Sequence, residues 1–349
     1  MMQKARNSAT SSSPSILLRN NRTKNIGLLC HHRRSKTLLC QFLIISIVPI
    51  VLSTPTTSYH NSAFVNSSCL DNNSQICGSQ ENAAAAISYR QSKRYLNNMR
   101  AWTCHGRTQR EMVEKLAAAN IIKTDQVRQC LLRVDRANYA PERYSAYTDA
   151  PQPLGYGQTI SAPHMHAHTL EELLPSLISA SRNKPDTPLS ILDVGCGSGY
   201  LTAALGRLVD KGTTRFGGPI SPLVSGNVYG IDVVPELVDM SKINMKKDDA
   251  DLLHSGTVTV QLGDGWKGLP DKAPFHAIHV GAAADDFPHN LMMQLAVGGV
   301  MVIPVGPDGG IQNLYRVEKL RESPTFHGED FAIDRLLGVR YVPLVRIGP

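Results

Sequence analysis

Glycine and aspartate residues near the middle of the chain have the types and spacing that suit a nucleotide-like cofactor. Three glycines, Gly195, Gly197 and Gly199, follow the predicted strand 189–194, which contains Asp193. A glycine turn lets a ligand approach the backbone closely, because no Cβ atoms intervene. The turn therefore predicts an adenine-containing cofactor at the carboxyl end of a parallel sheet.

Two further acidic residues follow the next two predicted strands. Asp232 ends the strand predicted at 228–231, and Asp264 with Gly265 follows the strand predicted at 258–262. The carboxyl ends of parallel strands meet at one edge of a sheet, so these residues are expected to converge on the ligand. Asp232 can bind ribose hydroxyls, and the turn at Asp264 can meet an adenine amino group.

Two classes of cofactor compete for the glycine turn. Nicotinamide and flavin dinucleotides require G-x-G-x-x-G, in which the third glycine allows close packing of the following helix. Tyr200 occupies that sixth position here. The spacing G-x-G-x-G after an aspartate is typical of S-adenosylmethionine-dependent methyltransferases, whose cofactor has no phosphate. The sequence therefore favours the methyltransferase class.

Predicted strands alternate with helices over the second half of the chain, which indicates an α/β fold. The pattern predicts a doubly wound, mostly parallel sheet, with an antiparallel edge formed by strands near 312–319 and 338–345. Helical periodicity from Arg110 and again from Asp125 predicts two flanking helices before the first cofactor strand. Further elements are predicted as helices at 235–247 and 291–296 and as strands at 275–280 and 300–305.

The segment 144–168 is rich in proline, glycine and tyrosine and predicts an irregular functional loop, with a helix from His166 to about Ser181. His164, His166 and His168 alternate within it. No carboxylate partner is evident beside them. We therefore expect them to pack and to form hydrogen bonds rather than to bind a metal.

Charge divides the chain into two regions. Residues 1–100 contain twelve basic and two acidic side chains, a net charge of +10, so residues 101–349 carry −3 of the total of +7. The basic character therefore belongs to the N-terminal region, and no nucleic-acid surface is expected on the catalytic domain that we place at 101–349. The insertion 211–227 interrupts this domain with four glycines and two prolines.

An apolar run at 38–52 follows an acid-free, basic leader. Its fifteen residues are fewer than the roughly 20 needed to cross a bilayer as a helix. The length suits a secretory signal, whereas the leader composition suits an organelle transit peptide. A two-part signal for a plastid of secondary origin, a short uncleaved anchor and a misassigned start codon are the alternatives. The run predicts contact with a membrane or translocon, and the compartment stays open.

From about Glu111 to Val345 the sequence resembles the protein-L-isoaspartate (D-aspartate) O-methyltransferase family. The resemblance implies a class I, Rossmann-like fold. It also implies repair of damaged proteins by methylation of the free carboxylate of L-isoaspartyl and D-aspartyl residues. S-adenosyl-L-methionine would be the cofactor and S-adenosyl-L-homocysteine the product. Eight motifs carry the resemblance to this family: IIKTDQV (121–127), PQPLGYGQTISAPHMHA (151–167), LDVGCGSGYLTA (192–203), GIDVVPELVD (230–239), GDGWKG (263–268), AIHVGAAA (277–284), IPVGPDGG (303–310) and GVRYVPL (338–344).

The resemblance also assigns roles to individual residues. It identifies Ser161 as the active-site serine. Val345 departs from the threonine that the family often has at this position, which puts a hydroxyl contact there in doubt. The implied cofactor contacts are Gln158, Thr159, Ile160, His166, Asp193, Gly195, Gly197, Asp232, Asp264 and Gly265.

The expected chemistry requires few groups. An isoaspartyl α-carboxylate has a reference pKa of about 3.5, so it is ionised near neutral pH and needs no general base to attack a methyl group. The hydroxyl of Ser161 can hold this carboxylate without adding charge, and rate enhancement comes from placement and loss of water. A carboxyl methyltransferase with another substrate and an inactive cofactor-binding module are the alternatives. A monomer is expected.

Overall fold

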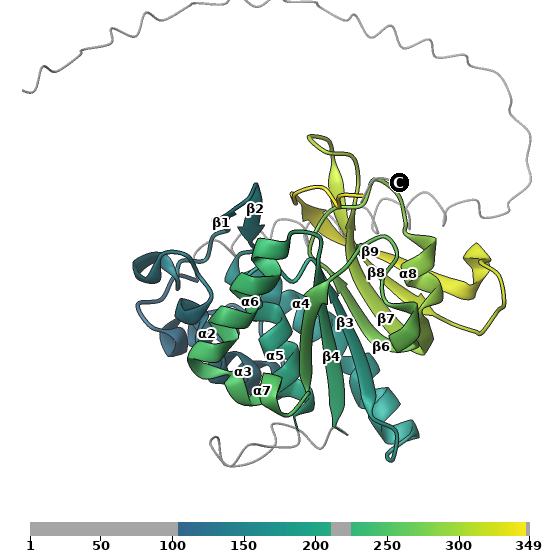
Figure 1. Ribbon diagram of the computed structural model, residues 1–349, viewed down its shortest axis with the longest axis horizontal. Helices are drawn as coiled ribbons and strands as arrows, with labels where there is room; N and C mark the ends of the chain where they lie inside the picture. The colour runs from purple at the N-terminus through teal and green to yellow at the C-terminus, as the bar shows by residue number, and fades with distance from the viewer. Residues whose placement is uncertain (1–103, 211–224, 347–349) are drawn as a thin grey trace, which may run out of the picture. The chain divides into compact units, whose positions relative to one another are not determined.

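A seven-stranded sheet forms the centre of the structure (Figure 1). The computed structural model describes residues 104–210 and 225–346, which all belong to one compact unit of the chain. In sheet order the strands are β5 (Val258–Leu262), β4 (Gly226–Asp232), β3 (Leu189–Val194), β6 (Phe275–Val280), β7 (Leu295–Val305), β8 (Gln312–Lys319) and β9 (Phe331–Val339). Neighbouring strands from β5 to β7 are parallel, and β8 is antiparallel to β7 and β9. The predicted sheet with an antiparallel edge is confirmed.

The central strand β3 separates two apolar cores. Side chains alternate between the two faces of a strand. Leu189 and Ile191 accordingly lie in the larger apolar cluster, whereas Leu192 and Val194 lie in the smaller one. A strand that is buried on both faces needs a nearly continuous apolar sequence, which is what made β3 predictable.

Most of the helices contribute side chains to the larger cluster, and Figure 1 shows these helices beside the sheet. α4 contacts β3, β6 and β7, α5 contacts β3, β4 and β5, and α6 contacts β4 and β5. The short α8 contributes Leu291 and Met292 to the smaller cluster. The helix bounds are α2 (Gln109–Ala118), α3 (Asp125–Arg133), α4 (Pro163–Asn183), α5 (Tyr200–Val209), α6 (Pro235–Asp248), α7 (Ala250–His254) and α8 (His289–Met293).

The two helices before the sheet, α2 and α3, begin at threonine caps. The side chains of Thr108 and Thr124 accept hydrogen bonds from backbone N–H groups of the first turns. Glu171 of α4 accepts hydrogen bonds from the backbone N–H groups of Lys123 and Thr124 at 2.7 and 2.9 Å. This carboxylate joins the start of α3 to α4, so the predicted flanking helices are confirmed as a layer attached to the sheet domain.

The segment 144–168 is more regular than its composition predicted. It contains an antiparallel hairpin of β1 (Gln152–Gly155) and β2 (Gln158–Ile160), and α4 begins at Pro163 rather than His166. The prediction failed because proline and glycine hide the two-residue period of such short strands. Proline also suits the first turn of a helix, where its missing N–H has no intrahelical partner.

The C-terminal region corrects a second prediction. β9 ends at Val339, so the strand predicted at 338–345 is wrong. This segment instead passes beside the residues that follow β6, where the N–H of Ala283 donates to the carbonyl of Val342 at 2.8 Å. The apolar pattern of this segment therefore reflects contact with the end of the sheet rather than membership of a long strand.

Several sequence predictions fall on residues that the structure does not describe. They are the N-terminal region 1–100 with its apolar run 38–52, and residues 211–224 of the insertion 211–227. Within the described ranges, no helix combines the length and the apolar character needed to cross a membrane.

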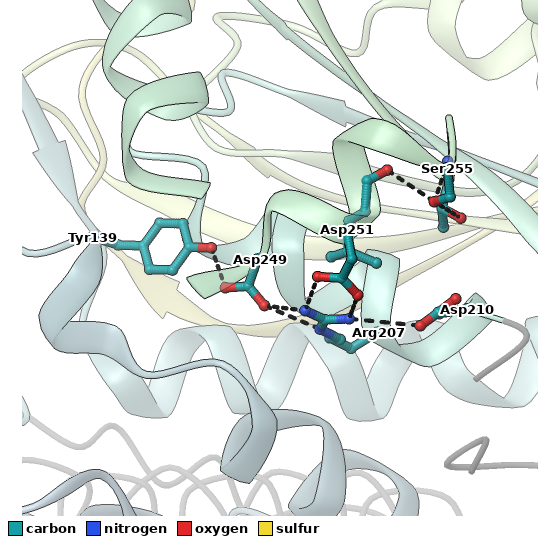
Figure 2. Close-up of polar contacts among 8 residues, drawn as sticks. Tyr139, Arg207, Asp210, Asp249, Asp251 and Ser255 are labelled. Atoms are coloured by element: carbon teal, nitrogen blue, oxygen red, sulfur yellow. Dashed lines mark hydrogen bonds and ion pairs between the residues drawn. The ribbon is translucent and has the colours of Figure 1, made fainter. Parts of the chain in front are cut away.

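A buried ionic network joins α5 to the junction of α6 and α7 (Figure 2). Arg207 is 1% exposed and donates to the carboxylate of Asp249 at 2.7 and 3.0 Å and to that of Asp251 at 2.6 and 2.8 Å. Tyr139 donates its hydroxyl to Asp249 at 2.5 Å, and Asp210 lies 3.6 Å from the guanidinium. Burial alone lowers the pKa of Arg207, but its bonds to the two aspartates raise it overall. The network therefore stays charged.

Candidate active site

A pocket opens at the carboxyl ends of β3, β4, β5 and β6. It contains about 540 Å³ of empty space, including the part that is open to solvent. The strand order reverses at β3, because the chain adds β4 on one side and β6 on the other. Ligands of open α/β sheets bind at such a switch point. The pocket is lined by Gln158, Thr159, Val194, Gly195, Gly197, Ile231, Asp232, Val233, Leu237, Gly263, Gly265, Gly281, Ala282 and residues 342–345.

The glycine turn after β3 lines the pocket, but its N–H groups point into the protein. Gly195 and Cys196 donate to the carbonyl of Ile231 at 2.8 and 3.0 Å. Gly197 donates to Oδ2 of Asp232 at 2.9 Å. A dinucleotide turn leaves such groups free for a pyrophosphate. These three N–H groups already have acceptors within the protein. The turn can therefore contact a ligand through its backbone surface, but it does not bind an anion.

Asp232 reaches the pocket from the end of β4. Its two oxygens accept from the N–H groups of Gly197 and Val234, at 2.9 and 3.0 Å, which fixes the carboxylate in place. Burial raises its pKa, and these backbone hydrogen bonds oppose the rise. Asp232 is 6% exposed and lines the pocket. Each carboxylate oxygen has two lone pairs, so the carboxylate can accept further hydrogen bonds from a ligand.

Asp193 lies below the glycine turn and does not line the pocket. It is 1% exposed, and its two oxygens bond to the hydroxyl of Thr202 at 2.5 Å and to Nδ1 of His279 at 2.7 Å. Both contacts are internal. Asp193 therefore links α5 to β6 and supports the sheet beneath the glycine turn.

The turn after β5 contributes backbone rather than charge. Gly265 lines the pocket, where an added Cβ would lie 2.8 Å from side-chain atoms of both Val194 and Leu344. Asp264 accepts from the N–H of Trp266 at 2.9 Å and does not line the pocket. Only a glycine at position 265 allows the turn to approach the neighbouring wall this closely.

The segment after the β1–β2 turn enters the pocket and carries the predicted serine. Gln158 and Thr159 line the pocket, whereas Ile160 is 4% exposed and anchors the segment in the larger core. Ser161 follows, half-buried, with its side chain close to the hydroxyl of Tyr341, the residue that precedes the pocket-lining segment 342–345. Burial raises the pKa of Tyr341 to about 12, so both hydroxyls are neutral near pH 7. The structure thus places Ser161 beside the pocket wall.

His166 lies behind this segment and does not line the pocket. Its ring is 7% exposed and packs edge-on against Tyr200 with centroids 5.1 Å apart. Nδ1 lies 3.2 Å from Nη1 of Arg136. Because arginine only donates, Nδ1 must accept. Burial and the charge of Arg136 hold the pKa of His166 well below its usual value, so the ring is neutral.

The wall formed by residues 342–345 was not among the predicted site residues, although the resemblance raised a contact at Val345, which lines the pocket. Leu344 donates its N–H to the carbonyl of Ala283 at 2.7 Å and accepts from Nε1 of Trp266 at 3.0 Å. The side chain of Gln312 also holds the backbone of Tyr341, with Oε1 accepting from its N–H at 2.7 Å. The motif GVRYVPL was visible in the sequence, but the sequence does not reveal its contact with the pocket.

The other two histidines have separate environments. His164 bonds to Asp149 through Nδ1 at 2.7 Å. Burial lowers the pKa of His168 to about 4, and its Nε2 has no hydrogen-bond partner among the residues described. Within the same residues, no group of histidine, cysteine and acidic side chains is arranged to bind a metal ion.

The fold and the pocket define the class of the protein as a class I, Rossmann-like methyltransferase. Residues 107–347 match the model of the protein-L-isoaspartate(D-aspartate) O-methyltransferase family. The chain belongs to this family.

Individual relatives agree with the family model. A protein-L-isoaspartate O-methyltransferase of Triticum aestivum is 41% identical over 234 residues, which cover 67% of this chain and 89% of the relative. Its counterpart in Caenorhabditis elegans is 37% identical over 220 residues, 63% of this chain and 88% of the relative. A Plasmodium falciparum structure described as a protein-L-isoaspartate O-methyltransferase, in complex with S-adenosyl-L-homocysteine, is 31% identical. It has a TM-score of 0.56 and covers 69% of this chain and 99% of that one.

Proposed function

We propose that this protein transfers the methyl group of S-adenosyl-L-methionine to the free carboxylate of L-isoaspartyl residues, and of D-aspartyl residues, in damaged proteins. Family membership supports the reaction. The observation that carries the proposal is the position of Ser161, two residues after the pocket-lining Thr159 and close to Tyr341, which precedes the pocket wall 342–345. A carboxylate held by this hydroxyl lies at the mouth of a cofactor pocket.

The pocket fits S-adenosyl-L-methionine better than a dinucleotide. Asp232 is the only charged side chain among the described residues that line it, and no lysine or arginine is present there to neutralise a phosphate. The N–H groups of Gly195 and Gly197 are paired internally. When bound, S-adenosyl-L-methionine supplies the methyl group, and S-adenosyl-L-homocysteine is the product.

We assign the residues as follows. Asp232 accepts hydrogen bonds from the ribose hydroxyls, and the turn of Asp264 and Gly265 borders the adenine. Gly195 and Gly197 admit the methionine portion. Gln158 and Thr159 close the pocket on the substrate side. Three buried residues, Ile160, His166 and Asp193, act by supporting the segments that contact the cofactor.

Ser161 orients the substrate without exchanging a proton. The isoaspartyl carboxylate is already ionised near neutral pH, so the site needs no base. The Ser161 hydroxyl donates to one carboxylate oxygen and directs the other toward the methyl group. Orientation and exclusion of water are then the contributions that the protein makes to the rate.

Replacing Ser161 with alanine is expected to lower kcat/KM about 10- to 100-fold, because one hydrogen bond to a charged group contributes about 1.5–3 kcal/mol. Affinity for S-adenosyl-L-homocysteine should stay within about threefold of the original. Methyl transfer to an isoaspartyl peptide and calorimetric binding measure the two effects. Unchanged turnover would remove Ser161 from the reaction.

An isoaspartyl peptide and its normal aspartyl twin distinguish the proposed reaction from methylation of another carboxylate. We expect turnover of the isoaspartyl peptide and no detectable turnover of the twin. The two peptides have the same composition and charge, so the difference reports the position of the carboxylate alone. Equal rates on both would contradict the proposed substrate.

That the protein acts as a monomer remains a prediction from the sequence. Contact with a membrane or translocon through residues 38–52 remains a prediction from the sequence.

A further inference from the structure

Ser161 lies between two regular elements and belongs to neither. β2 ends at Ile160 and α4 begins at Pro163, so no sheet ladder or helix turn fixes the backbone of Ser161. A misplacement of about 1 Å at a reacting group can cost about 100-fold in rate. If Ser161 orients the substrate, as proposed above, other contacts must hold it.

Arg136 provides the first of these contacts. It is 0% exposed, and its Nη2 donates to the carbonyl oxygen of Ser161 at 2.8 Å. Nε donates to the carbonyl of Ala146 at 3.0 Å, and Nη1 to His166 at 3.2 Å. No described carboxylate forms an ion pair with Arg136. Burial of a guanidinium is costly, so its donors are directed at specific acceptors, and one of these is the backbone of Ser161.

Asp149 provides the second contact. It acts at His164, in the first turn of α4, three residues after Ser161. The N-cap of α4 is Ala162, which has no side-chain acceptor, and Pro163 has no N–H. The N–H of His164 donates to Oδ1 of Asp149 at 3.0 Å, and Nδ1 of the same histidine lies 2.7 Å from this oxygen. A residue distant in sequence therefore caps the helix that starts beside Ser161.

The position of Asp149 is itself fixed. Its side chain is 0% exposed, and its backbone N–H donates to Nδ1 of His105 at 2.9 Å. Its second oxygen, Oδ2, is buried without a hydrogen-bond partner among the described residues. A carboxylate held in this way stabilises the first turn of α4 from outside the helix.

We propose that Arg136 and Asp149 are positioning residues of the methyl-transfer reaction, and that they act by holding Ser161 from its two sides. Arg136 fixes the carbonyl of Ser161, and Asp149 fixes the start of α4 at His164. Neither side chain lines the cofactor pocket. Arg136 and Asp149 therefore influence the orientation of the substrate carboxylate and not the binding of the cofactor.

A double-mutant cycle in the full-length chain tests this inference. Asp149→Ala, Asp149→Asn and Arg136→Lys are each made in the original chain and in the Ser161→Ala background. For each, kcat and KM on an isoaspartyl peptide and Kd for S-adenosyl-L-homocysteine are measured. Asp149→Asn retains an acceptor at Oδ1, whereas Asp149→Ala does not. Arg207→Lys is the matched control, because it makes the same change at a buried arginine that lies in the α5–α7 network.

We expect Asp149→Ala and Arg136→Lys to lower kcat at least tenfold in the original chain and less than twofold in the Ser161→Ala background. Such non-additivity indicates that the residues act through Ser161. Asp149→Asn should recover most of the rate. Kd should change less than threefold throughout, and Arg207→Lys should leave kcat within twofold in the folded protein.

Equal losses of kcat in both backgrounds would overturn the inference, because they would indicate general damage to the fold. If Asp149→Ala does not fold, the cycle with Asp149→Asn and Arg136→Lys decides alone, and additive effects there overturn it. The role of Ser161 is tested separately. Ser161→Ala with its original turnover would overturn both that role and the inference, whereas a large Ser161→Ala effect without coupling overturns the inference alone.

Discussion

Replacing Asp232 with alanine is expected to weaken binding of S-adenosyl-L-homocysteine about 100-fold. Two hydrogen bonds from ribose hydroxyls to a charged acceptor contribute about 3 kcal/mol or more, and a factor of 100 corresponds to about 2.7 kcal/mol. The substitution also leaves the N–H groups of Gly197 and Val234 without their acceptor. Calorimetric titration of the full-length chain with S-adenosyl-L-homocysteine measures the change.

Two comparisons make the Asp232 experiment specific. Asp239→Ala removes an exposed aspartate from α6, the helix that follows Asp232, and should leave the affinity unchanged. Burial raises the pKa of Asp232, and the ionised form is the one that accepts from the ribose. Affinity should therefore fall as the pH is lowered through this raised pKa. An Asp232→Ala protein that binds as tightly as the original would contradict the assignment.

Replacing Arg207 with methionine is expected to lower the free energy of unfolding by about 3–5 kcal/mol. This is the usual cost of breaking a buried ion pair by removing one partner. Asp249 is 0% exposed and would keep only the hydroxyl of Tyr139 as a donor in the network of Figure 2. Urea unfolding of the full-length chain near neutral pH measures the loss.

The second substitution Asp249→Asn tests the reason for that loss. It removes the uncompensated charge, so the double variant should recover much of the stability of Arg207→Met. Burial already raises the pKa of Asp249, and loss of Arg207 raises it further. A raised pKa favours the folded state at low pH, so the deficit of Arg207→Met should shrink as the pH falls. A deficit that is independent of pH and of Asp249→Asn would point to lost packing.

The central sheet could be predicted because its strands carry their own signal. The strands predicted at 258–262, 275–280 and 312–319 have the same bounds in the structure. β6 is buried along nearly its whole length and forms a short apolar run, whereas buried positions alternate with more exposed ones in β5 and β8. Glycines follow β5 and β6. The cofactor edge followed from the fold, since parallel strands place their carboxyl ends together.

The start of α4 depends on residues that are distant in sequence and could not be predicted. Asp149 caps the first turn of this helix at His164, from 15 residues upstream. The local sequence pattern does not predict a contact with a residue so far away in the chain. The hairpin of β1 and β2 was missed for a related reason, because its four- and three-residue strands are too short to display a period.

Strand register decides which acidic residue faces the pocket. Asp193 on β3 pairs with Gly230 on β4, so Asp232 lies two residues nearer the carboxyl edge. Asp193 therefore remains inside the sheet with Thr202 and His279, whereas Asp232 reaches the pocket. Both residues follow apolar runs in the sequence, and only the pairing of the strands separates them.

The cofactor edge of the sheet and the serine segment come from different parts of the chain. Asp232 and the glycine turns belong to residues after 189, whereas Arg136, Asp149 and Ser161 precede them. Changes at Arg136 or Asp149, which do not line the pocket, can therefore alter the use of the substrate while cofactor affinity is retained. Gln158 and Thr159 are the exception, because they precede residue 189 and still line the pocket, so the segment that carries Ser161 is the place where a single change can act on both cofactor and substrate.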